Sequence, residues 1–208
     1  RRKIGHRLAE EHPVEADVVI AVPDSSNSIA LGYSERSGIR FELGLIRNHY
    51  VGRTFIQPHQ GDRDSSVRVK FNPVREILVG KRIVLVDDSI VRGTTSRKLV
   101  RMLRKNGAAA VHFRVGSPPV THPCFYGIDT PSRRELIGAV KTTEEIREYL
   151  SADSLGYLSH EGLLACERDA GRFCSACFTG RYPVAVDPEA TKLSLERMHR
   201  EAGAGSGR

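Results

Sequence analysis

The 208-residue sequence predicts an α/β fold in which a mostly parallel, twisted sheet is flanked by helices. The compact apolar run IVLV, residues 83–86, has the pattern of a strand that is buried on both faces. Residues 95–106, further along the chain, have helical spacing, because apolar Leu99, Val100 and Leu103 stand among basic residues. With 39% hydrophobic residues, the chain can bury the full core of one domain.

The first part of the chain alternates helical and strand patterns. The charged N-terminus, residues 1–16, is helix-like and lacks the apolar core of a signal peptide. Residues 17–22 (DVVIAV) predict the first strand, because β-branched residues dominate them. We then expect a helix over residues 28–37, stopped by Gly38, and a second strand over residues 40–46 (RFELGLI).

A long polar stretch, residues 47–66, contains Gly and Pro and separates this part from the rest. Loops of that length inside a compact domain are commonly functional lids or disordered. Residues 64–79 are expected to carry a helix.

The second part repeats the strand-and-helix alternation. A loop joins the strand that contains IVLV to the helix, and Gly107 is a natural stop for that helix. Thr142 begins a Thr-x-x-Glu cap for a later short helix. The remaining expected elements are the strand at 83–86, a helix at 95–106, a strand at 109–117, a loop at 118–132, and short helices at 133–139 and 142–150.

The formal charge of +7 comes from Lys and Arg residues that are spread along the whole chain. A surface that binds nucleic acid would need clustered basic residues and aromatic side chains for stacking, whereas this sequence contains no Trp and no recognisable nucleic-acid-binding motif. No apolar run approaches the roughly 20 residues that span a bilayer. We therefore expect a small polyanionic substrate, no nucleic acid, no membrane and a cytoplasmic location.

Two adjacent carboxylates, Asp87 and Asp88, end the apolar run IVLV. Both stay ionised only near cations or hydrogen-bond donors, and such oxygen-rich sites suit Mg²⁺ held partly through a phosphate substrate. Gly93 then allows backbone to approach an anion, Thr94 and Thr95 offer hydroxyls, and the helix N-terminus adds free N–H groups. These residues predict a phosphate cradle beside a site for hydroxyls or metal. By themselves they leave open a surface turn with a Thr cap.

The run VLVDDSIVRGTTS resembles the phosphoribosyl pyrophosphate (PRPP) signature of the type I phosphoribosyltransferases. Three further motifs, YVGRTFIQP, HPCFYGID and CFTGRYP, resemble one family in that class, the amidophosphoribosyltransferases or glutamine PRPP amidotransferases, in their Bacillus-like iron–sulfur branch. The motifs occur in the expected order, and the resemblance runs from about Asp17 to Pro183. It implies a type I phosphoribosyltransferase fold with a flexible active-site loop.

The resemblance also implies roles for individual residues. The acidic pair would face the ribose hydroxyls, and Ser25 in the VPDSS turn, with Asp87 and Asp88, would hold Mg²⁺. Segment 47–58 would close over PRPP, and Arg53 is a catalytic candidate for charge on the pyrophosphate, with an exposed, solvated arginine as the alternative. The implied catalytic residues are thus Asp87, Asp88 and Arg53. The implied PRPP-binding residues are Ser25, Asp87, Asp88, Ser89, Ile90, Val91, Arg92, Gly93, Thr94 and Thr95.

The implied reaction is displacement of pyrophosphate from C1 of PRPP by ammonia, which gives 5-phosphoribosylamine in the first step of purine synthesis. In the family, a glutaminase domain with an N-terminal Cys supplies the ammonia from glutamine. Nothing in this chain resembles that domain, so we expect ammonia-dependent activity only. The family reads Lys-Asn-Arg-Tyr where this chain has Arg47, Asn48, His49 and Tyr50, a departure that bears on inhibition by purine nucleotides.

Two other classes would share the PRPP loop. A PRPP-sensing regulator would be expected to carry an added DNA-binding domain. A nucleobase-salvage phosphoribosyltransferase would explain the loop but not HPCFYGID or the cysteine motif. Both remain as alternatives to the amidophosphoribosyltransferase.

The cysteines form a second candidate site. Cys174 and Cys177 are spaced as CxxC, which in an intracellular protein suggests metal or redox chemistry, and buried thiols or a zinc site fit the spacing too. The resemblance implies a [4Fe–4S] cluster with Cys124, Cys174 and Cys177 as ligands. Four thiolates are usual for such clusters. We expect the fourth ligand to be missing from this chain, and Cys166 is not expected to replace it.

The expected domain organisation follows from these motifs. Residues 1–183 would form the phosphoribosyltransferase domain, with the CxxC segment at 166–183. Residues 184–208 would form a partly disordered C-terminal helix or tail. We expect the N-terminal glutaminase domain to be absent from this chain, and the protein to be a homo-oligomer.

Overall fold

The computed structural model describes residues 1–48, 50 and 70–186. A four-stranded parallel sheet with the strand order β1-β4-β5-β6 forms its centre. The strands are β1 (Val18–Ala21), β4 (Arg82–Asp87), β5 (Ala110–Val115) and β6 (Ser154–Tyr157). Val19 lies opposite Val84, and Leu85 lies opposite Phe113. The predicted mostly parallel sheet is therefore confirmed.

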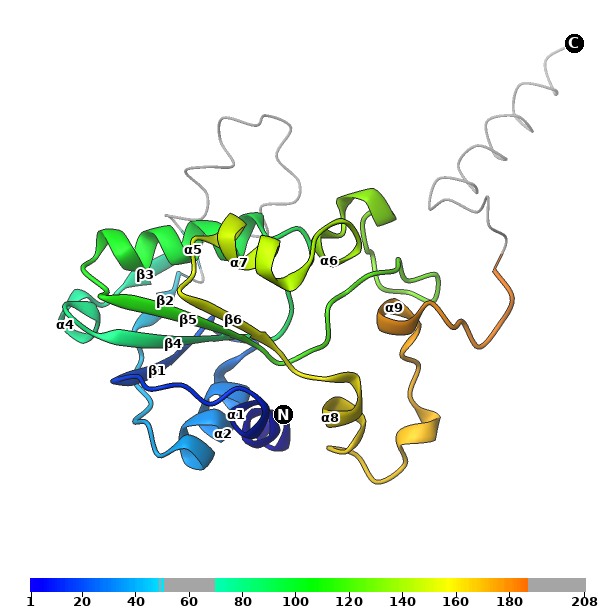
Figure 1. The fold of residues 1–208 in the computed structure, drawn as a ribbon, viewed down its shortest axis with the longest axis horizontal. Coiled ribbons are helices and arrows are strands. Elements are labelled where there is room, and N and C mark those ends of the chain that lie inside the picture. Colours follow the sequence, from blue (N-terminus) through cyan, green and yellow to red (C-terminus); the bar gives the residue numbers. More distant parts are fainter. Residues whose placement is uncertain (49, 51–69, 187–208) are drawn as a thin grey trace, which may run out of the picture.

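Helices cover both faces of this sheet, as Figure 1 shows. On one face lie α1 (Arg2–Glu11) and α2 (Asn27–Ser37), and on the other lie α5 (Thr94–Lys105) and α7 (Thr143–Leu150). Side chains alternate between the faces along each strand, so each face has its own buried cluster. Val19 and Val84 pack with α1 and α2, whereas Leu85 packs with α5 and α7. The molecule is a three-layer α/β/α domain.

The helices begin and end close to where the sequence predicts. Gly38 ends α2 in the left-handed region with φ 74°. Thr142 caps α7 in a reciprocal capping box with Glu145. The shorter helices are α4 (Arg75–Leu78), η2 (Arg133–Glu135), α6 (Ile137–Val140), α8 (His160–Leu164), η3 (Ala170–Arg172) and α9 (Ala176–Thr179).

The predicted strand at 40–46 is wrong in most of its length. Phe41 makes one isolated parallel bridge to Val19, and the chain then leaves the central sheet. A β-carbon at Gly44 would lie 2.7 Å from Cγ2 of Ile20, so the backbone passes directly over that side chain. Beyond it, β2 (Leu45–Arg47) pairs antiparallel with β3 (Phe71–Pro73) in a separate two-stranded sheet.

The predicted helix at 64–79 is also corrected. Within its described part, residues 71–73 form β3, which interrupts the predicted helix before Arg75–Leu78. The sequence pattern also missed β6, whose four residues SLGY include Gly156 and make no apolar run. A β-carbon at Gly156 would meet the His12 ring at 2.6 Å, which explains the glycine.

Several predictions lie outside the described residues. Most of the closing loop at 47–58, including Arg53, falls there, as does the tail beyond residue 186. The boundaries proposed for the domain therefore stay predictions. Among the residues that the structure describes, no helix is both long and apolar enough to cross a membrane.

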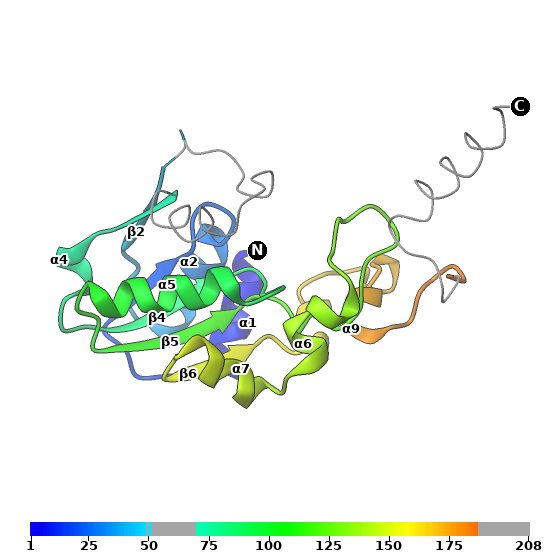
Figure 2. The same ribbon diagram turned by 90° about the horizontal axis from the view of Figure 1, so that it is seen from above.

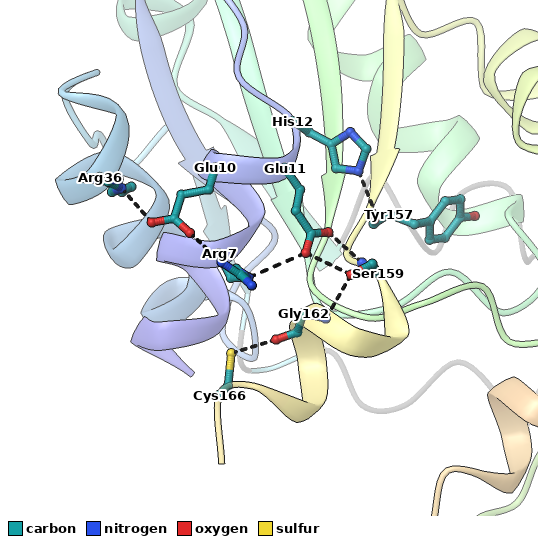
Figure 3. Close-up of polar contacts among 9 residues, drawn as sticks. All are labelled: Arg7, Glu10, Glu11, His12, Arg36, Tyr157, Ser159, Gly162 and Cys166. Atoms are coloured by element: carbon teal, nitrogen blue, oxygen red, sulfur yellow. Dashed lines mark hydrogen bonds and ion pairs between the residues drawn. The ribbon is translucent and has the colours of Figure 1, made fainter. Parts of the chain in front are cut away.

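The N-terminal helix is tied to two distant parts of the chain. Gly5 of α1 and Gly32 of α2 face backbone of the other helix, where a β-carbon would collide, so the two helices pack in close contact. At the end of α1, the Glu11 carboxylate accepts hydrogen bonds from the Ser159 N–H at 2.7 Å and its hydroxyl at 2.8 Å (Figure 3). This polar cluster joins α1 to the start of α8.

Candidate active site

The acidic pair lies where neighbouring parallel strands end. Asp87 is the last residue of β4, and the VPDSS turn, residues 22–26, follows β1 beside it. A backbone hydrogen bond of 2.9 Å from the Val22 N–H to the Val86 carbonyl holds the two strand ends together. The carboxyl edge of a parallel sheet is the usual position for a ligand site.

Asp87 is a buried carboxylate beside a second one. Its side chain is 8% exposed, and its Oδ1 accepts hydrogen bonds from the Ser26 hydroxyl at 3.1 Å and from the Asp88 N–H at 2.8 Å. Burial and the neighbouring Asp88 charge raise the pKa of Asp87 to about 7, although both donors and Lys70 act in the opposite direction. Among the residues that the structure describes, Lys70 and the two donors do not offset the effects of burial and Asp88.

The loop after the acidic pair leads directly into α5. The Ser89 hydroxyl donates to Oδ1 of Asp88 at 3.0 Å. Gly93 precedes the first turn of α5 with φ 74°, a left-handed conformation that favours glycine. Thr94 and Thr95 are exposed at the helix start, where backbone N–H groups and the helix dipole favour an anion. These features suit a phosphate.

Segments that come later in the sequence support this loop. The Ile137 N–H donates to the Val91 carbonyl at 2.9 Å, and Arg92 pairs with Glu135 at 3.0 Å. A β-carbon at Gly93 would lie 2.8 Å from Cδ1 of Ile137, and the Tyr149 ring is nearly as close. The loop therefore rests on η2, α6 and α7.

The VPDSS turn presents its two serines differently. Ser25 is exposed, and its carbonyl accepts a hydrogen bond from Arg1. Ser26 is fully buried and contacts Asp87. Asp24 in the same turn pairs with Arg47 at 3.0 Å.

The predicted site residues of the acidic pair and the 89–95 loop thus lie together, with Ser25 in the adjacent turn. Arg53 lies outside the described residues. Sequence reasoning missed Ser26, although its place beside Ser25 in the turn after a buried strand was the available indication. It also missed Glu135, Ile137 and Tyr149, whose positions depend on tertiary packing.

The predicted cluster cysteines come from two segments that lie side by side. The Thr121 and His122 N–H groups both donate to the Cys177 carbonyl at 3.0 Å. Burial raises the pKa of the Cys177 thiol, and the nearby Cys124 and Cys174 thiols raise it further. Across the described parts of the chain, no group of three or more His, Cys, Asp or Glu side chains is arranged to hold a metal ion. Three neighbouring thiols are nevertheless the donor type that iron–sulfur clusters need.

Cys166 has a separate environment. Its buried thiol donates to the Gly162 carbonyl at 3.3 Å within α8 and its C-terminal turn (Figure 3). That Cys166 does not join the other three thiols stays a prediction.

The parallel sheet, the acidic pair and the glycine before α5 define the class: this is a type I phosphoribosyltransferase-like domain. No family model matches the chain. It is 58% identical over 202 residues to the amidophosphoribosyltransferase of Synechocystis sp., and 55% identical over 192 residues to that of Bacillus subtilis. These matches cover 95% and 89% of this chain. The particular family that the chain matches is therefore the amidophosphoribosyltransferases, and the resemblance predicted from the motifs is confirmed.

Solved structures give the same result. The chain is similar to the glutamine PRPP amidotransferase from B. subtilis complexed with ADP and GMP, with a TM-score of 0.81 and 54% identity over 91% of this chain. It covers 43% of that structure, and 41% of the Synechocystis sp. relative. The chain thus spans about two fifths of the length of the proteins that it matches.

Proposed function

We propose that this chain carries the PRPP-using half of an amidophosphoribosyltransferase. It would form 5-phosphoribosylamine and pyrophosphate from PRPP and ammonia, the first step of purine synthesis. The single observation that supports this best is the buried Asp87 carboxylate, with its raised pKa, beside Asp88 and next to the start of α5, where the free N–H groups suit an anion. A phosphorylated sugar has the hydroxyls and the phosphate that such a pair of subsites would recognise.

For this reaction, the main task of the protein is to position PRPP and ammonia relative to each other. The N–H groups and hydroxyls at Thr94 and Thr95 would bind the 5′-phosphate, while Asp87 and Asp88 would orient the ribose through its hydroxyls. The ammonia nitrogen forms a bond to C1 as the bond from C1 to the pyrophosphate oxygen breaks. The bond electrons leave with pyrophosphate, and the new ammonium group loses a proton to solvent. Arg53, in the loop proposed to close over PRPP, would stabilise charge on the leaving group.

The oxygen donors of this site suit Mg²⁺. Asp87 and Asp88 are adjacent carboxylates, and the raised pKa of Asp87 marks a place where a cation would be stabilising. Ser25 is the third ligand that we propose. Bound Mg²⁺ would neutralise charge on the pyrophosphate oxygens.

We also propose that Cys124, Cys174 and Cys177 hold an iron–sulfur cluster of the [4Fe–4S] type. Burial raises the pKa of the Cys177 thiol, and the Cys124 and Cys174 thiols raise it further, which is what negative charge at neighbouring thiolates does. A bound cluster would compensate this charge and fasten the 121–126 segment to the CxxC segment. Iron and sulfide content per chain, compared with Cys174→Ser, would test the assignment, since tightly bound zinc would contradict it.

Further partners follow from the same family. The glutaminase domain of the family would supply ammonia from glutamine, and purine nucleotides would inhibit, as the ADP and GMP in the B. subtilis relative suggest. We propose a homo-oligomeric, cytoplasmic protein.

Release of pyrophosphate from PRPP tests the function directly. Four reactions with Mg²⁺ should be compared, containing ammonia, glutamine, a mixture of nucleobases, or no acceptor. We expect product with ammonia and none with glutamine or nucleobases. Nucleobase-dependent release would favour a salvage enzyme, and PRPP binding without any turnover would favour a sensor.

A further inference from the structure

Ser26 occupies the N-cap position of α2, yet its hydroxyl makes no hydrogen bond to that helix. A serine at an N-cap normally accepts a hydrogen bond from a backbone N–H in the first turn, which stabilises the helix. Two other helices of this chain follow the rule. The Ser159 hydroxyl accepts from the Gly162 N–H at 2.8 Å, and the Thr142 hydroxyl accepts from the Glu145 N–H at 3.3 Å.

The Ser26 hydroxyl instead donates to Oδ1 of Asp87 at 3.1 Å. The contact is sequestered from water, because Ser26 is fully buried and Asp87 is 8% exposed. The two residues are 61 positions apart, so the bond joins the turn after β1 to the end of β4. Ser26 thus gives up the usual helix cap for a contact with a site residue. Such departures from local preference are expected at functional positions.

Asp87 is thereby held by two donors that converge on one oxygen. The Asp88 N–H is the second donor, at 2.8 Å. The Asp88 bond fixes the carboxylate relative to its own strand, and the Ser26 bond fixes it relative to the VPDSS turn. Together they set the orientation of the carboxylate plane and the spacing between the two sides of the site.

We propose that Ser26 is a positioning residue: its hydroxyl orients the Asp87 carboxylate and ties the VPDSS turn to the acidic pair that would orient the ribose. Ser26 acts through Asp87 and does not itself contact substrate. The inference rests on the proposed function, because it assigns Ser26 a part in binding PRPP. Groups that orient the first ligands of a metal or substrate commonly change affinity or activity by about 10- to 100-fold when removed.

The test compares Ser26→Ala with Ser34→Ala. Ser34 lies on the same helix, and its hydroxyl donates to the Ile39 carbonyl at 2.6 Å, away from the acidic pair. Both variants lose one hydrogen bond from a serine of the α2 region, so a purely structural role predicts similar behaviour. PRPP binding with Mg²⁺ is measured by calorimetry, together with kcat and KM for ammonia-dependent pyrophosphate release and the melting temperature.

We expect Ser26→Ala to raise the Kd for PRPP by about tenfold or more, whereas Ser34→Ala should bind like the parent. The melting temperatures of the two variants should be similar. Equal PRPP affinity in both variants would overturn the inference. If the parent neither binds nor turns over PRPP, the proposed function fails instead, so the two failures are distinguishable.

Two more substitutions separate hydrogen bonding from packing. Ser26→Cys keeps the size of the side chain with a weak donor, and Ser26→Thr keeps the hydroxyl. We expect Cys to behave like Ala and Thr to restore most of the affinity. A Cys variant that binds PRPP like the parent would contradict the inference, and this comparison holds even if Thr does not fit the buried position.

Discussion

Two carboxylates of this chain, Asp87 and Glu11, each accept a hydrogen bond from the hydroxyl of a serine far away in the sequence. Glu11 lies in the cluster of Figure 3, where Arg7 is 3.7 Å away and Ser159 gives two donors. Asp87 also has two donors, but its charged neighbour is Asp88, another carboxylate. The first cluster is internally compensated, whereas at Asp87 burial and the Asp88 charge outweigh the opposing effect of Lys70.

This difference distinguishes a structural cluster from the proposed binding site. A compensated carboxylate fastens one element to another and needs nothing further. A buried carboxylate beside a like charge raises the free energy of the empty protein, and a ligand that supplies cations or donors removes that cost. The comparison therefore predicts that changes at Asp87 affect ligand binding and pH dependence, whereas changes at Glu11 affect stability alone.

The largest expected effect is on how the free energy of unfolding depends on pH, through Asp87. The pKa of Asp87 is about 7 in the folded chain and 3.8 in its ordinary state, so the folded form binds a proton more tightly than the unfolded form. Its contribution to stability is complete below pH 4 and is lost as the pH rises through 7, by at most about 4 kcal/mol. Asp87→Asn should remove that decline.

Urea unfolding at several pH values between 4 and 8, with EDTA present, measures this. The variant should gain stability over the parent as the pH rises. Parallel curves for Asp87→Asn and the parent would mean that Asp87 is compensated like Glu11.

The next largest effect is on turnover. Asp87→Asn and Asp88→Asn should each lower the ammonia-dependent release of pyrophosphate by on the order of 10²- to 10³-fold, because each removes charge from the proposed sugar and metal site. Circular dichroism should show an unchanged fold. Turnover close to that of the parent in both variants would make the acidic pair a surface turn.

Glu11→Ala should lower stability and leave turnover nearly unchanged, the reverse of the effects expected at Asp87 and Asp88. It removes the acceptor for both Ser159 donors, and we expect the free energy of unfolding to fall by about 1–3 kcal/mol. Turnover should stay within about twofold of the parent, since the cluster is not part of the site. Glu10→Ala is the matched control on the same helix, because its exposed ion pairs with Arg7 and Arg36 should contribute little. A large loss of PRPP affinity in Glu11→Ala would break the comparison.

The smallest effect is expected at the exposed pair of Arg92 and Glu135. Glu135→Gln should change the Kd for PRPP by less than about threefold, because packing of Gly93 against Ile137 and Tyr149 still supports the loop. Gly93→Ala provides the contrast, since its β-carbon would collide with Ile137 and its φ is positive. Calorimetry on both variants shows whether the ion pair or the packing holds the phosphate loop.

Much of the fold was predictable because local patterns agree with the tertiary structure. The IVLV run is a central strand, and the caps at Gly38 and Thr142 fall at helix ends. Failures occurred where long-range contacts decide the conformation. The backbone at Gly44 crosses over Ile20, so residues 40–46 leave the central sheet despite their strand-like pattern. Gly156 interrupts the apolar pattern of β6, so that strand was not predicted.

The candidate site divides in the same way. Asp87, Asp88 and the 89–95 loop are contiguous, so a motif could reveal them. Ser26 was missed because only the pairing of β1 with β4 shows which serine of VPDSS turns inward. No local pattern distinguishes a serine that caps a helix from one that donates to a distant carboxylate.

The short bridge at Phe41 has a consequence for how the sheet meets other molecules. Beside β1, the Val19 N–H donates to the Arg40 carbonyl at 2.9 Å, and the Glu42 N–H donates to the Val19 carbonyl at 3.0 Å. Those two bonds use the outward-facing backbone groups of Val19, which would otherwise offer a template for a strand from another chain. Residues 40–42 therefore cover this part of the sheet edge, which disfavours pairing with a strand of another chain and so disfavours aggregation.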